Sequence, residues 1–161
     1  MIARDIVLDL FENTLQKQAW QAQPSLAEAL EGLTARQAAW KPSPERHSIW
    51  QIVRHLIRWE PGILQAWDGD PPDKAELQRG DWPEVSGDQY AWETDVQTLV
   101  ALYAEFVTRV KAASNEELSR SILWYRDGVS IQPLAIRLAR RTVHYMYHVG
   151  QIRYLRALQG A

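Results

Sequence analysis

Apolar residues recur at helical spacing in four long stretches of the chain, residues 3–20, 49–67, 88–113 and 131–158. Within each stretch they return every three or four positions, which gathers them on one side of an α-helix. Most prolines and glycines lie between the stretches, where helices start and stop. Four amphipathic helices predict an all-α fold, and its default arrangement is an up-down four-helix bundle.

The side chains expected to build the core share the inner face of each helix. They are Ile6, Leu10, Phe11 and Leu15 in the first stretch, Ile49, Ile52, Leu56, Trp59, Ile63 and Trp67 in the second, Trp92, Val96, Leu99, Tyr103, Phe106 and Val110 in the third, and Leu134, Leu138, Tyr145 and Ile152 in the last. The four faces together suffice for one hydrophobic core, so residues 1–161 are predicted to be a single helical-bundle domain.

Several helix ends carry recognisable capping residues. Ser25 precedes a short predicted helix over residues 26–31, and Glu28 stands three positions later, as in a capping box. Ser48 is the expected N-cap of the second long helix, and Gly160 terminates the last one.

Two connecting regions are not predicted to be helical. Residues 68–88 hold three prolines and three glycines, so a long irregular loop is expected, of a kind that is often functional. Trp82, in its middle, is interpreted either as a lid over the functional site or as an anchor that pins the loop to the body. In residues 121–130, aromatic and β-branched residues surround Asp127-Gly128, which predicts a β-hairpin packed on the bundle.

Composition narrows the range of functions. The net charge of −2 provides no basic surface for a nucleic acid. Cysteine is absent, which excludes disulfides, thiolate metal sites and cysteine nucleophiles. The N-terminus lacks the apolar run of a signal peptide, and no uncharged segment reaches the roughly 18 residues of a membrane span. A cytoplasmic protein without membrane or nucleic-acid partners is therefore expected.

The strongest chemical signal is a pair of histidines in the last helical stretch. His144 and His148 are four residues apart, so both rings lie on one side of a helix and can reach one common atom. His55 lies at the edge of the apolar stripe of residues 49–67, where it faces a neighbouring helix. Three such imidazoles meeting inside a bundle would form a metal site with an open position for water or substrate. His47 precedes the helix and is interpreted as a loop or packing residue, with a substrate contact as the alternative.

A three-histidine site suits one divalent transition metal, such as zinc, nickel or iron. Three protein ligands is the number typical of a catalytic site, and metal-bound water or a thiolate is the expected nucleophile. No side chain is assigned as catalytic, because no glutamate lies between His144 and His148 to act as the general base of a zincin. The same residues also fit a non-catalytic metal- or ligand-binding bundle, in which the metal is structural or sequestered.

Two further side chains are predicted next to these ligands. Gln151 follows His148 by one helical turn and can hydrogen-bond a ligating ring or a bound water, with ordinary packing as the alternative. Trp59 follows His55 by one turn and is expected in the pocket beside the site.

Arg137 and Arg141 lie on the histidine-bearing side of the last helix. Arginine near an apolar stripe must be paired or line a wet cavity. The two arginines are therefore expected either to form an anion subsite above the metal or to pair with an acid such as Glu60 or Glu105.

Three sequence blocks occur in a characteristic order along the chain. They are Pro24-Ser25-Leu26 with Leu30-Glu31-Gly32-Leu33-Thr34, then Trp40-Lys41-Pro42 with His47-Ser48-Ile49-Trp50 and Arg54-His55-Leu56, and finally His144-x3-His148-Val149-Gly150-Gln151-Ile152. In this order the blocks resemble the DinB-like superfamily (DinB/YfiT-like proteins), a group of metal-binding four-helix proteins. The resemblance covers essentially the whole chain.

The resemblance implies a ligand set and a range of activities. It assigns the metal to His55, His144 and His148, which match the family's second-helix histidine and its C-terminal His-x3-His pair. Related families include thiol-dependent S-transferases, a thiol-dependent isomerase and metal-dependent hydrolases. The expectation is thus a metal-dependent enzyme that hydrolyses a small molecule or transfers a low-molecular-weight thiol to it. A homodimer formed through a helix face is also expected.

Overall fold

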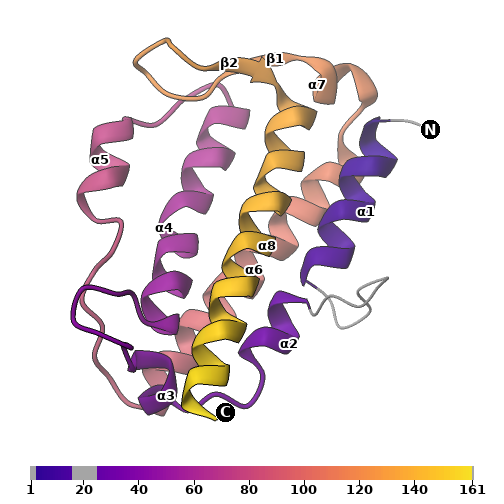
Figure 1. The fold of residues 1–161 in the computed structure, drawn as a ribbon. Helices are drawn as coiled ribbons and strands as arrows, with labels where there is room; N and C mark the ends of the chain where they lie inside the picture. Colours follow the sequence, from indigo (N-terminus) through magenta and orange to yellow (C-terminus); the bar gives the residue numbers. More distant parts are fainter. Residues whose placement is uncertain (1–2, 16–24, 161) are drawn as a thin grey trace.

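A computed structural model of the protein describes residues 3–15 and 25–160. Four long helices form its body: α1 (Ala3–Leu15), α4 (Ile49–Trp67), α6 (Gln89–Ala112) and α8 (Leu134–Gln159) (Figure 1). Helix α1 packs against α6 and α8, and α4 packs against the same two helices. The predicted all-α four-helix bundle is confirmed. Residues 16–20, which the sequence pattern assigns to the first helix, lie outside the described residues.

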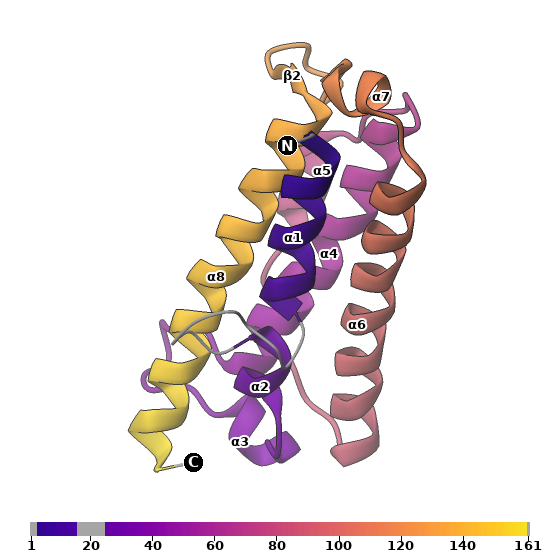
Figure 2. The same ribbon diagram turned by 90° about the vertical axis from the view of Figure 1, so that its right-hand side faces the viewer.

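The helices do not alternate in direction as in a simple up-down bundle. Helices α4 and α6 run the same way, and α1 and α8 run the opposite way (Figures 1 and 2). Asp68, at the end of α4, accordingly binds Arg109 near the end of α6. The expectation of up-down connectivity is therefore wrong. The reason is that residues 68–88 are long enough to return the chain along α4, which spans about 28 Å at 1.5 Å per residue.

This return segment is not wholly irregular. It contains a short helix, α5 (Lys74–Arg79), whose first turn is capped by the side chain of Asp73 accepting from the Glu76 amide. The expectation of an unstructured loop is wrong at this point, because an aspartate cap and a run of good helix formers outweigh the flanking prolines and glycines.

The predicted caps are confirmed. Ser25 begins α2 (Leu26–Leu30) and Ser48 begins α4, each within a capping box. A third capping box at Thr34 begins α3 (Ala35–Ala39). Gly160 ends α8 with a φ of +68°, a left-handed conformation that glycine adopts without strain.

After the short helix α7 (Asn115–Ser119), the chain forms the predicted hairpin. Strands β1 (Ser121–Leu123) and β2 (Ile131–Pro133) pair antiparallel, with Leu123 opposite Ile131, and β1 contacts α4. The sequence pattern assigned residues 131–133 to the first turn of the last helix, and this prediction is wrong, because these residues form a strand. Pairing with β1 keeps them extended, and α8 begins directly after Pro133.

The core fills the space between the four long helices. Its largest fully buried side chains include Trp50, Phe106 and Tyr103. The predicted inner faces of α4, α6 and α8 are buried, apart from the half-buried Trp59 and Val96. None of the helices in the described part of the chain is long and apolar enough to cross a membrane.

The inner face of α1 differs from the prediction. Val7 and Phe11 are buried, whereas Ile6 is 44% exposed. Apolar residues stand next to one another along this helix, as in Ile6-Val7-Leu8 and Leu10-Phe11, so its sequence pattern does not single out one face. Contact with α6 and α8 selects the Val7 face.

Candidate metal centre

Helices α4 and α8 bring three histidines together at one point between them. His55 comes from α4, and His144 and His148 come from successive turns of α8. The Nε2 atom of His144 lies 3.2 Å from Nε2 of His148 and 3.4 Å from Nε2 of His55. Two nitrogens bound at 2.0–2.1 Å to one tetrahedral ion would lie roughly 3.3 Å apart. The spacing of the three nitrogens therefore fits a single metal ion.

The outward nitrogens of two rings meet hydrogen-bond acceptors. The Nδ1 atom of His55 lies 2.5 Å from Oδ1 of Asp81, and Nδ1 of His148 lies 2.7 Å from Oε1 of Gln151. An acceptor at this position keeps the proton on Nδ1 and leaves the lone pair of Nε2 directed toward the other rings. His55 and His148 are thus in the tautomer that a metal ligand requires.

His144 has a different neighbour. Nη1 of Arg141 lies 3.0 Å from its Nδ1 atom. A guanidinium group only donates hydrogen bonds, so Nδ1 accepts here and the proton of the neutral ring lies on Nε2. Ligation of a metal through Nε2 therefore requires the ring to lose this proton from Nε2. If the proton moves to Nδ1, Nδ1 becomes a donor and can no longer accept from Arg141.

Burial favours the neutral form of all three rings. Desolvation lowers the pKa of His144 to about 3, with further lowering by the charge of Arg141. Desolvation lowers the pKa of His148 to about 4, and it also lowers the pKa of His55, against the opposing effect of Asp81. A neutral imidazole is the form that binds metals, so the chemistry of the donor set fits such an ion.

The segment between α4 and α6 supplies the residues that hold His55. Asp81 accepts from Trp59 Nε1 at 2.5 Å as well as from His55. Trp82 stacks on His55 with ring centres 4.2 Å apart, and His47 stacks on the other face of Trp82 at 3.8 Å. Trp82 therefore covers His55, whereas its opening as a lid stays a prediction. His47 stays outside the three-histidine cluster and packs, as expected, in the loop region.

Asp81 is the site residue that the sequence analysis missed. It stands 26 positions after His55, in a segment without a periodic pattern. An acidic residue next to a tryptophan in a long loop is a weak signal, and only the path of the chain brings it behind the histidine.

A second polar cluster adjoins the histidines. Oε1 of Glu60 accepts from Nε of Arg141 at 2.7 Å, from Nη2 of the same guanidinium and from the Tyr145 hydroxyl at 2.6 Å. Glu60 is completely buried. Of the two roles considered for Arg141, the structure shows pairing with Glu60, whereas Glu105 pairs with Arg109.

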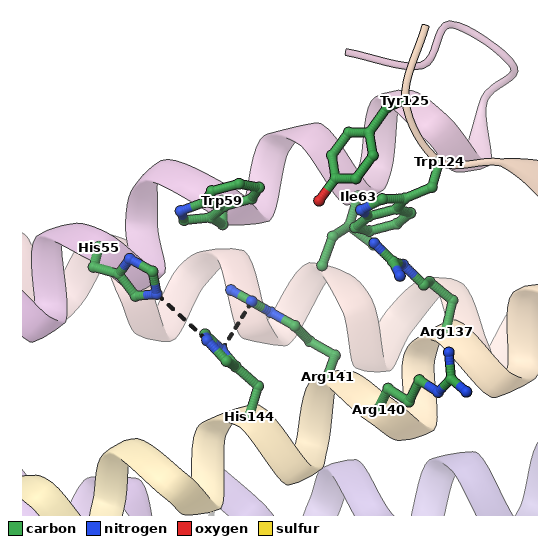
Figure 3. Close-up of a pocket in the computed structure, with 9 residues that line it drawn as sticks. All are labelled: His55, Trp59, Ile63, Trp124, Tyr125, Arg137, Arg140, Arg141 and His144. Carbon is green, nitrogen blue, oxygen red and sulfur yellow. Dashed lines mark hydrogen bonds between the residues drawn. The ribbon is translucent and has the colours of Figure 1, made fainter. Parts of the chain in front are cut away.

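A cavity of about 280 Å³ opens beside the histidines (Figure 3). It is lined by His55, Trp59, Ile63, Trp124, Tyr125, Arg137, Arg140, Arg141 and His144. Neither His148 nor Gln151 lines this cavity. A molecule in the cavity would thus meet two of the three histidines and the guanidinium of Arg137.

Comparison with known proteins identifies relatives by family and by fold. A family model described as the DinB superfamily matches residues 18–152, which include all three histidines. YfiT from Bacillus subtilis, described as a probable metal-dependent hydrolase with an unusual four-helix bundle topology, shares the fold with a TM-score of 0.61 and 15% sequence identity. The similarity covers 98% of this chain and 86% of that protein. No curated protein sequence matches the chain.

Proposed function

Because the chain belongs to the DinB superfamily, we propose that it is a divalent-metal-dependent enzyme with His55, His144 and His148 as metal ligands. One observation carries the proposal. Three imidazoles from two helices converge, with the Nε2 atom of His144 3.2 Å from that of His148 and 3.4 Å from that of His55, a spacing that suits a single ion. Zinc, nickel and iron all accept such a donor set.

The side chains around the ligands have separable roles. Asp81 and Gln151 orient the rings of His55 and His148 through their outward nitrogens. Trp82 shields one face of His55 from solvent. A divalent metal held there would act as a Lewis acid and lower the pKa of a water or thiol that approaches from the cavity.

The cavity favours an enzyme over a purely structural site. A structural metal is usually enclosed by four protein ligands, whereas the described residues within reach offer three. The cavity beside His55 and His144 also leaves room for a small substrate. Hydrolysis is the first reaction that we propose, and transfer of a low-molecular-weight thiol is the second. A non-catalytic metal- or ligand-binding bundle is the alternative.

Elemental analysis of protein purified without a histidine tag tests the metal site. We expect about one equivalent of a transition metal in the wild type, and loss of that metal in the variant His148→Ala. The variant His47→Ala is the matched control, because it removes the one histidine that lies outside the cluster. It is expected to keep the metal.

The outcome decides between the proposed classes. A wild type that neither contains metal nor takes up zinc, nickel or iron would overturn the proposal. If metal is present, metal-loaded protein is then assayed with small esters and amides, and separately with a thiol and an electrophilic acceptor. Turnover that is lost in His148→Ala identifies an enzyme, whereas bound metal without turnover in either assay supports the binding alternative.

A homodimer stays part of the proposal, and the outer face of α8 supports it. This face exposes an apolar stripe at helical spacing, made of Ile136, Val143, Tyr147, Tyr154 and Leu158. Light scattering after size-exclusion chromatography tests it: Val143→Lys should give a monomer, and Val129→Lys, on the exposed hairpin turn, should leave the dimer intact. A wild type that elutes as a monomer at micromolar concentration would overturn it.

A further inference from the structure

The end of the cavity away from the histidines contains a cation without an acidic partner. The guanidinium carbon of Arg137 lies 3.5 Å from the ring centre of Trp124 and 5.8 Å from that of Tyr125. Figure 3 shows these three side chains together, opposite His55 and His144. Among residues 3–15 and 25–160, no carboxylate forms an ion pair with Arg137.

The other two arginines of the cavity are already engaged. Arg141 is paired with the buried Glu60, and the exposed Arg140 donates to Oε1 of Gln132 at 2.7 Å. Arg137 is half-buried, and its partners are the two aromatic side chains. Burial lowers its pKa to about 10, so it still carries its charge at neutral pH. The cavity thus holds one desolvated positive charge that no described acid balances.

The donors at this end also lack acceptors. Stacking uses the face of the guanidinium, whereas its N–H groups lie in its plane and point away from the ring. Trp124 is 5% exposed, and its buried Nε1–H has no acceptor among the described residues. A buried donor without a partner is costly, and such groups are usually satisfied by a ligand, an ion or water. The hydroxyl of Tyr125 lies at the same end of the cavity and can also donate (Figure 3).

We propose that this end of the cavity, formed by Arg137, Trp124 and Tyr125, binds the carboxylate or phosphate group of the substrate. The assignment rests on the proposed function, because it takes the reacting part of the same molecule to lie at the histidine end. Trp59 and Ile63 form the wall between the two ends, which suits an apolar or aromatic spacer. The substrate class is then a small organic oxyanion with its reactive group at the opposite end.

Calorimetric titration with three simple probes tests the subsite. The probes are 4-fluorobenzoate, phenylphosphonate and the neutral 4-fluorobenzamide, each added to metal-loaded and to chelator-treated protein. At least one anion should bind about tenfold more tightly than the amide, because a charge-assisted hydrogen bond to Arg137 forms only with the anion. The better of the two anions then distinguishes a carboxylate from a phosphoryl substrate.

Variants link the binding to the named donors. Arg137→Gln should weaken binding of the anion about tenfold or more, and Trp124→Phe, which keeps an aromatic ring but deletes the N–H, about threefold. Arg153→Gln removes an exposed arginine of the same helix and should change the affinity less than about twofold. Arg137→Lys keeps a positive charge and should retain part of the affinity for the anion. Retained affinity in this variant would show that the loss in Arg137→Gln comes from the missing charged donor and not from misfolding.

The results that would overturn the subsite are distinct from those that would overturn the metal centre. Equal binding of anion and amide, or anion binding that survives in Arg137→Gln, excludes the subsite. Anion binding that appears only with metal and ignores Arg137→Gln would be direct ligation of the metal, and it also excludes the subsite. His148 does not line the cavity, so His148→Ala should lose metal and keep anion binding. A wild type without metal overturns the proposed function, while the anion comparison still decides the subsite.

Discussion

Two buried polar clusters lie side by side between α4 and α8, and they differ in how their groups are paired. In the first, Glu60 accepts hydrogen bonds from Arg141 and Tyr145, so opposite charges meet inside the cluster. In the second, the Nε2 atoms of three histidines face one another, and for two of the rings the acceptors stand behind, at Asp81 and Gln151.

The difference indicates what each cluster does. The carboxylate–arginine cluster is balanced by the protein itself and joins the two helices. The histidine cluster gathers nitrogen atoms of one kind, and a cation at their centre is what complements them. Arg141 belongs to both clusters, because the guanidinium that binds Glu60 also contacts Nδ1 of His144. The first cluster pairs buried opposite charges, so we expect it to govern the stability of the fold. The second cluster gathers the proposed metal ligands, so we expect it to govern metal binding.

Breaking the ion pair should give the largest effect. Glu60→Gln leaves the buried Arg141 without its counter-charge and should lower the free energy of unfolding by about 3–5 kcal/mol. Urea denaturation of metal-free protein, followed by circular dichroism, measures this change.

Two further variants make that result decisive. Glu105→Gln removes an exposed partner of Arg109, with the Glu105 side chain 47% exposed, and should cost no more than about 1 kcal/mol. Replacing both members, Glu60→Leu with Arg141→Met, should recover much of the lost stability, because no charge is then left buried. Equal losses in Glu60→Gln and Glu105→Gln would contradict the structural role of the pair.

Metal addition should produce the next largest effect, and it should act through the second cluster alone. A free metal concentration of 100 times the dissociation constant should stabilise the wild type by about 2.7 kcal/mol, because the folded state binds and the unfolded chain does not. Thermal unfolding with and without metal measures the gain. His47→Ala should show the same gain and His148→Ala none, whereas an equal gain in both would place the metal elsewhere.

Removing the carboxylate behind His55 should weaken metal binding without loss of a ligand. Asp81→Asn should reduce the metal affinity about 10–100-fold, because the ring of His55 loses its charged acceptor. Competition with a chromophoric chelator measures this affinity. Asp70→Asn, which alters only an exposed pair with Arg126, is the control. An unchanged affinity in Asp81→Asn would show that Asp81 does not position the ligand.

The smallest expected effect comes from the amide behind His148. Gln151 offers a neutral acceptor and is only half-buried, so Gln151→Ala should reduce the metal affinity about threefold. The same chelator competition, with Gln159→Ala as the control, measures it. If Gln151→Ala reduced the metal affinity as much as Asp81→Asn does, the charge of Asp81 would not be the reason for its larger expected effect.

Some features of this protein depend only on residues that are close in sequence. The capping box at Ser25, the N-cap at Ser48 and the glycine terminator at Gly160 could be located from the sequence, because each involves atoms within one helical turn. The same is true of the approach of His144 to His148, since i,i+4 residues are neighbours on any helix. The four long helices could be predicted from the helical spacing of their apolar residues.

Other features were decided only when the chain folded. The parallel course of α4 and α6 depends on the path of residues 68–88, and the buried face of α1 depends on its neighbours, because the helix has apolar residues on both sides. The same path carries Asp81 to His55.

Pairing between distant side chains belongs to this second group. From the sequence, both Arg137 and Arg141 could form an ion pair with an acid such as Glu60 or Glu105. The rotation of α4 against α8 pairs Glu60 with Arg141, and the hairpin places Trp124 beside Arg137. Periodicity determines which face of a helix is apolar, whereas the contacts between faces are set by packing, where a shift of one residue exchanges one partner for another.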